Sequence, residues 1–249
     1  MCWNAPVSFA TFAGGSLLNI LSYWALSRRG SLVAPLVWAW QYALLMQIPE
    51  GIVWARLDAG VASSSIQVES RVAFFLNVTQ PLSLYVAIRS LGIELRYAHV
   101  ALFMYFLLLV VDLPEYWERT ESIGPSDGCE HLNLGYWNPS RGFLYVFAAL
   151  FVISELPSLY WATINSAIFL LSLLFAAIFY NCGLGSMWCW LIWTAGPLLV
   201  LADVAKALVE RAARRSGDPS RGALAASRAR PAAWRATPAR ELWTHRSSV

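Results

Sequence analysis

Long apolar runs dominate the chain, and polar residues are largely confined to the stretches between them. Seven runs are long enough to cross about 30 Å of hydrocarbon, and they lie near residues 6–27, 32–55, 72–90, 97–114, 142–163, 165–184 and 187–208. None alternates polar and apolar positions as a β-barrel strand does, and in lipid the backbone must satisfy its own hydrogen bonds. The pattern predicts an all-α integral membrane bundle of seven transmembrane helices over residues 1–210.

Composition agrees with this class and sets the last segment apart. Hydrophobic residues make up 58% of the 249 positions and charged residues 13%, whereas a soluble domain has roughly 25% charged residues. Residues 211–249 are rich in Arg, Ala, Pro and Ser, which predicts a disordered basic tail. Each basic residue near a membrane surface contributes on the order of 1 kcal/mol of attraction to anionic lipid, so we expect the tail to bind anionic lipid head groups.

The arginines predict an orientation. If the N-terminus is outside, one side of the membrane receives the tail and the arginines of two connections, which are Arg28, Arg29, Arg89 and Arg96. The opposite side receives most of the acids and the arginines Arg56, Arg71, Arg119 and Arg141. Basic residues accumulate on the cytoplasmic side, so the N-terminus is predicted outside and the C-terminus in the cytoplasm. The expected location is multi-pass in the plasma membrane or an endomembrane.

The cysteines fit that orientation. All four fall at or near the predicted outer face, and they are Cys2, Cys129, Cys182 and Cys189. An even number of cysteines on the non-cytoplasmic side is typical of disulfide chemistry in an oxidising compartment. We predict at least one bridge, with Cys2 to Cys129 as the candidate. The alternative for Cys182 and Cys189 is that they are ordinary buried thiols.

Five polar residues in the predicted spans are candidates for ligand or ion binding, and they are Glu155, Glu50, Gln47, Asn77 and Gln80. Glu155 falls near the middle of the predicted fifth span, and a carboxylate at that depth is costly and typical of a functional site. Gln47 and Glu50 share a helix face in the second span, as Asn77 and Gln80 do in the third. These groups could line one cavity. The alternative is that they only join helices, at about 0.6 kcal/mol for each hydrogen bond.

The single lysine, Lys206, raises the possibility of a retinal Schiff base on the last span. It lies about 12 Å from the midpoint of that span, however, where its long side chain can reach water. The third span also has no acidic residue in its middle that could serve as a counterion. We therefore favour a snorkelling lysine paired with Asp203, and we predict no cofactor. Only a retinal protein would use Lys206 and Asp203 as cofactor-binding residues.

These features favour a transporter or channel-like protein for a small polar solute or ion. The alternative is a seven-span receptor or sensory protein, of which a photoreceptor is the less favoured form. No hydrolase constellation or phosphate-binding glycine loop occurs, so no enzyme is predicted. The cysteines and histidines lack the spacing of zinc ligands, so no metal is predicted. The expected partners are membrane lipids and the solute, and no nucleic acid.

Three short motifs carry a resemblance to a known family. They are the opening Met1 to Ala5, the Gln80-Pro81 pair of the third span, and the stretch Cys129 to Trp137. Together they resemble an uncharacterised family of small seven-span membrane proteins whose members begin Met-Cys-Trp-Ser. Asn4 departs from that opening, and the tail lies outside the resemblance. The resemblance implies the membrane topology and the outer cysteines, and it implies no activity.

Overall fold

The computed structural model describes residues 4–62, 65–119, 124–125, 132–133, 139–179 and 191–215. Its regular structure is helical apart from two short antiparallel strands, β1 (Gly124–Pro125) and β2 (Leu132–Asn133). The predicted all-α class is confirmed for the described residues, whose regular structure is almost entirely helical. The chain divides into two compact units, Met1–Asp203 and Val204–Val249, which are described separately below. The predicted cysteine bridge lies outside the described residues, because none of the four cysteines is among them.

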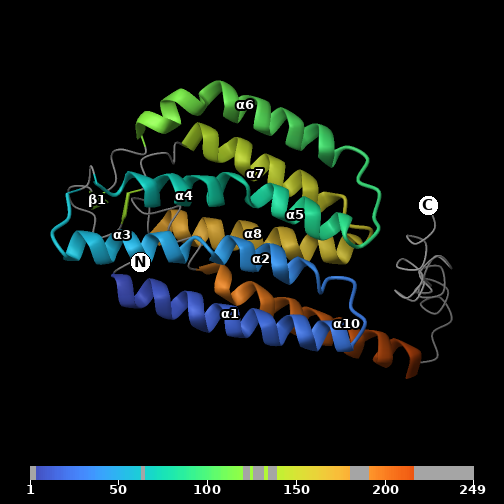
Figure 1. Cartoon of the computed structure of the whole chain (residues 1–249). Coiled ribbons are helices and arrows are strands. Elements are labelled where there is room, and N and C mark those ends of the chain that lie inside the picture. The colour runs from blue at the N-terminus through green and yellow to red at the C-terminus, as the bar shows by residue number, and fades with distance from the viewer. Residues whose placement is uncertain are drawn as a thin grey trace, which may run out of the picture. The chain divides into compact units, whose positions relative to one another are not determined.

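The helices of the chain follow one another along the apolar runs (Figure 1). In chain order they are α1 (Ala5–Arg28), α2 (Leu36–Leu44), α3 (Gln47–Asp58), α4 (Gln67–Val78), α5 (Gln80–Arg89), α6 (Ala98–Arg119), α7 (Pro139–Ser154), α8 (Leu159–Phe179), the short η3 (Ile192–Thr194) and α10 (Ala195–Arg215). Within the described part of the chain, four helices are long and apolar enough to cross a membrane, or five if the bent pair α4–α5 is one span. This is the property expected of a membrane protein.

Three of the predicted spans are interrupted, so their continuity was predicted wrongly. The segment 32–55 forms α2 and α3, the segment 72–90 forms α4 and α5, and the segment 142–163 ends as α7 before α8 begins. A proline lies close to each interruption, and they are Pro49, Pro81 and Pro157. Proline has no N–H to donate and its ring collides with the preceding turn, so it breaks the hydrogen-bond ladder. At the second interruption the two helices meet at a bend of 42°.

Glycine ends two of the helices in the same way. After α1, Gly30 has a φ of 64°, and its N–H donates to the Ser27 carbonyl while the Ser31 N–H donates to the Leu26 carbonyl. After α3, Gly60 has a φ of 75° and makes the equivalent contacts. Glycine adopts positive φ without steric cost, so this left-handed cap stops the helix sharply. The cap at Gly30 fixes the residues on either side of it, Arg29 and Ser31.

Small residues allow α1 to approach its neighbours closely. A Cβ atom at Gly196, in the first turn of α10, would lie 2.4 Å from Asn19 Oδ1. A Cβ atom at Gly51 on α3 would lie 2.9 Å from the ring of Phe9 on α1. Lipid chains are as apolar as leucine, so membrane helices associate through close packing of this kind rather than through the hydrophobic effect. Both glycines are therefore packing positions.

The connections between helices fall at two ends of the first unit. One end carries the connections 29–35, 90–97 and 155–158, and it is called the Arg29 end below. The other carries the connection 59–66 between α3 and α4, where Arg56 pairs with Glu69, and it is called the Arg56 end. Arg28 ends α1 and Arg89 ends α5, so both lie at the Arg29 end, where the next connections begin. This grouping matches the one predicted from the arginines, although it does not identify either side of a membrane.

Candidate functional site

Four of the five predicted binding residues lie in the interior of the first unit. The exposed fraction is 0% for both Gln47 and Glu50 on α3, and 2% for both Asn77 on α4 and Gln80 on α5. Gln47 Nε2 donates to Glu50 Oε2 over 2.9 Å, one helical turn away. Amides and acids are among the residue types least often buried, so a group of four points to a specific role.

The α3–α4 hairpin places these residues at one level. Its register is set by the ion pair between Arg56 and Glu69 near the connection. Moving six residues away from the pair along each helix reaches Glu50 on α3 and Phe75 on α4. At 1.5 Å per residue this level is about 9 Å from the ion pair. Asn77 and Gln80 follow within the next two turns, so the four polar residues surround the two helix interruptions.

Three tyrosines from three other helices contact the interruption between α4 and α5. The Tyr42 hydroxyl lies 2.6 Å from Thr79 Oγ1, and it acts as the donor because Thr79 Oγ1 itself donates to the Phe75 carbonyl. The Tyr105 hydroxyl donates to the Val78 carbonyl over 3.0 Å. The Tyr145 hydroxyl donates to Gln80 Oε1 over 2.5 Å. Tyrosines of α2, α6 and α7 therefore fix the three consecutive residues 78–80.

Two buried donors in this region have no hydrogen-bond acceptor among the described residues. They are Asn77 Nδ2 and Trp54 Nε1, and Trp54 lies one turn beyond Glu50 on the same face of α3. A buried donor without an acceptor costs about 1–3 kcal/mol, so such groups are rare unless a ligand or water serves them. The region can therefore offer hydrogen bonds to a polar solute, next to one carboxyl group.

Glu155 does not lie where the sequence predicted. It follows the last residue of α7 at the Arg29 end, and it is only partly buried. Its Oε1 accepts a hydrogen bond from the Tyr97 N–H over 2.7 Å, immediately before the start of α6. A carboxylate at this position accepts from an N–H that has no partner within the helix, and it interacts favourably with the positive end of the helix dipole. Its predicted position in the middle of a continuous span was wrong, because Pro157 ends that helix.

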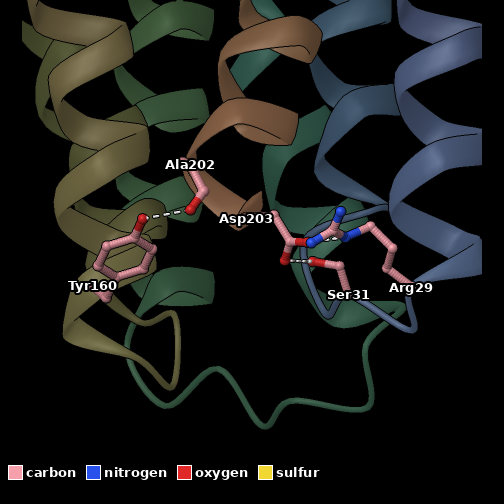
Figure 2. A network of polar contacts seen from close by, with 5 residues as sticks. All are labelled: Arg29, Ser31, Tyr160, Ala202 and Asp203. Carbon is pink, nitrogen blue, oxygen red and sulfur yellow. Dashed lines mark hydrogen bonds and ion pairs between the residues drawn. The ribbon is translucent and has the colours of Figure 1, made fainter. Parts of the chain in front are cut away.

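The predicted pairing of Lys206 with Asp203 was also wrong. Asp203 Oδ2 accepts from Arg29 Nε over 2.8 Å, and Asp203 Oδ1 accepts from the Ser31 hydroxyl over 2.9 Å (Figure 2). In the second unit, Lys206 Nζ lies 2.7 Å from Glu210 Oε1, and its side chain is 34% exposed. The retinal hypothesis gains no support from this partly exposed ion pair.

The network of Figure 2 joins three elements at the Arg29 end. Arg29 and Ser31 belong to the connection after α1, and Asp203 belongs to α10. On the other side of α10, the Tyr160 hydroxyl of α8 donates to the Ala202 carbonyl over 2.7 Å. The network therefore holds α1, α8 and α10 together at this end.

Replacement of Asp203 by Asn is expected to weaken this end only slightly. The asparagine keeps an acceptor for Ser31 and loses the ion pair, and Arg29 is 39% exposed, so solvent screens the pair to about 0.5 kcal/mol. Thermal unfolding in detergent at low salt measures the loss, which should shrink at high salt. A loss that does not change with salt would contradict the ion-pair explanation. The double variant Arg29→Asp with Asp203→Arg should recover part of the loss.

Sequence reasoning identified the four buried polar residues but missed the tyrosines that contact the interruption. Tyr105 lies in the middle of the predicted span 97–114, far from the expected membrane interfaces, where a hydroxyl needs a partner, so its position was a usable signal. Tyr145 lies only three residues inside the predicted span 142–163, where a tyrosine is ordinarily an interfacial anchor, so its position gave no such signal. No protein-family model, curated protein or solved structure matches this chain, so its function is argued from its own residues.

Proposed function

We propose that the protein is a transporter for a small polar solute or ion, with a binding site at Gln47, Glu50, Asn77 and Gln80. The observation that carries the proposal is that two interrupted helices lie side by side. A hydrogen bond joins Tyr42, one turn before the first interruption, to Thr79 at the second. Interrupted helices are tolerated at membrane depth where they are buried in protein or line a cavity, and in transporters they form the substrate site. Because all four side chains are buried, we favour a carrier that opens and closes, rather than a permanently open channel.

The order of the connections supports seven passes in this proposal. Proceeding from α1, successive chain segments run alternately toward the Arg29 end and the Arg56 end. The interrupted pairs α2–α3 and α4–α5 each count as one pass, and α7 counts as one shorter pass. Arginine is expected in excess on the cytoplasmic side, so we assign the Arg29 end to the inside and the N-terminus to the outside. The four binding residues then lie near the centre of the membrane, since each is within three residues of the midpoint of its interrupted pass.

A flux screen with a matched pair of variants tests the proposal. Purified protein is reconstituted in liposomes, and the uptake of radiolabelled amino acids, sugars, amines and inorganic cations is measured against liposomes without protein. For any solute that is taken up, the double variant Asn77→Leu with Gln80→Leu is expected to reduce the rate at least tenfold. The two substitutions remove the amide groups at the interruption and should lower stability by only about 1 kcal/mol in total.

The control is Asn165→Leu, which removes a fully buried amide on α8 whose Nδ2 donates to the Trp161 carbonyl one turn away. This variant should keep the wild-type rate. No uptake above protein-free liposomes for any tested solute or ion would overturn the proposal. Equal rates in the folded double variant and the wild type would overturn the assignment of the site.

A further inference from the structure

Glu50 differs from every other acid and base that the structure describes. It is the only one with an exposed fraction of 0%, whereas the remaining fully buried polar side chains are amides and hydroxyls. Its partner Gln47 is also fully buried and donates to its carboxyl group. A carboxyl group at membrane depth is costly to keep for packing alone and commonly marks a path for ions or protons.

The burial of Glu50 restricts which species can reach it in this conformation. An exposed fraction of 0% means that no sphere of the size of water touches the side chain. A hydrated cation or an organic ammonium ion therefore has no room beside the carboxyl group. A proton needs no cavity of its own, since it passes between hydrogen-bonded groups.

The charged groups on the helices packed against α3 lie toward its ends. On α3 itself they are Arg56 and Asp58, on α4 they are Glu69 and Arg71, and on α1 the one described charge is Arg28 at the opposite end. Arg71 places its guanidinium 4.0 Å above the ring of Trp117. Arg56 and Glu69, which are 36% and 16% exposed, form a polar surface about 9 Å from the level of Glu50, from which a proton could approach.

We propose that Glu50 binds and releases the proton that drives this transporter, an inference that rests on the function proposed above. In the loading step, an O–H bond of hydronium at the Arg56 end breaks and an O–H bond forms on the Glu50 carboxylate. In the release step, that bond breaks and the proton returns to water on the Arg29 side. Neither step involves oxidation or reduction, and the pH gradient across the membrane supplies the driving force.

Proton uptake into liposomes tests the inference without knowledge of the solute. The liposomes contain a pH-sensitive dye, an inward proton gradient is imposed, and valinomycin with potassium compensates the charge. Wild-type protein is expected to acidify the interior at least tenfold faster than protein-free liposomes, alone or together with a solute found in the flux screen. Glu50→Gln should remove this difference, and Glu94→Gln, an exposed acid-to-amide exchange, should leave it unchanged.

Wild-type uptake in folded Glu50→Gln would overturn the inference. Solute flux without any proton flux would also overturn this inference, but the proposal of a transporter would stand. The absence of both fluxes would overturn both proposals. If Glu50→Gln does not fold, the wild type is treated with dicyclohexylcarbodiimide, which reacts with protonated carboxyl groups in apolar surroundings. Mass spectrometry should find Glu50 modified, less so at higher pH, with proton uptake lost in parallel. Unmodified Glu50 with unchanged uptake would overturn the inference.

Discussion

Replacement of Gly196 by leucine is expected to prevent the chain from packing α1 against α10. Even the Cβ atom would lie 2.4 Å from Asn19 Oδ1 and 3.1 Å from the Ser22 hydroxyl. Asn19 cannot easily move away, because its Nδ2 donates to Gln41 Oε1, and Gln41 Nε2 donates to Ser16 Oγ. Overpacking a tight interior typically costs 1–3 kcal/mol and at times more, so Gly196→Ala should cost about 2 kcal/mol and leucine more.

The measurement is thermal unfolding in detergent, followed by tryptophan fluorescence and size-exclusion chromatography. The control is Gly14→Ala on α1, where an added Cβ atom meets nothing within 4 Å and alanine favours the helix by about 1 kcal/mol. Gly14→Ala should therefore unfold at the same temperature as the wild type or higher. Asn19→Ala should restore part of the stability lost in Gly196→Ala. Equal stability of Gly196→Leu and the wild type would show that these helices do not approach as described.

The triple variant Tyr42→Phe, Tyr105→Phe and Tyr145→Phe is expected to lose about 3 kcal/mol. Each substitution removes one hydrogen bond, worth about 1 kcal/mol, and keeps the ring that fills the interior. Two of the acceptors, the Val78 carbonyl and Gln80 Oε1, would then lose a donor in a buried place. Since the three bonds contact the consecutive residues 78–80, comparison of the triple variant with the sum of the single variants measures how strongly the bonds are coupled.

Denaturant unfolding of the single and triple variants measures these energies, and solute flux measures the effect on the proposed site. The control is Tyr85→Phe on α5, because the Tyr85 hydroxyl forms no hydrogen bond within the described part of the chain. This control should be close to the wild type in both assays. A triple variant with wild-type stability would mean that the tyrosines do not hold the interruption.

The helical class and the buried polar group could be predicted because both depend on local patterns. Apolar runs of membrane length indicate helices whatever their neighbours are. Gln47 and Glu50 lie one turn apart, as Asn77 and Gln80 do, so each pair shares a face by helix geometry alone. Their common depth follows from the direction of the chain in successive helices.

The interruptions and the long-range partners could not be predicted in the same way. Pro49 and Pro197 look alike in the sequence, yet α2 and α3 separate close to Pro49, whereas Pro197 lies in the first turn of α10. Proline is tolerated in a first turn, and the position of that turn depends on the fold. Asp203 was assigned to Lys206 because they are close in sequence, but it bonds Arg29 across the bundle. Such partners are set by tertiary packing.

The position of the two interruptions has a mechanical consequence for the α3–α4 hairpin. One interruption lies at Leu45 and Met46 and the other at Thr79, so the hairpin is attached to the rest of the chain through two pivots at nearly the same depth. Tilting it as a rigid lever would change backbone torsions only there. Such a tilt would move Gln47, Glu50 and Asn77 together relative to Gln80, which lies beyond the second pivot.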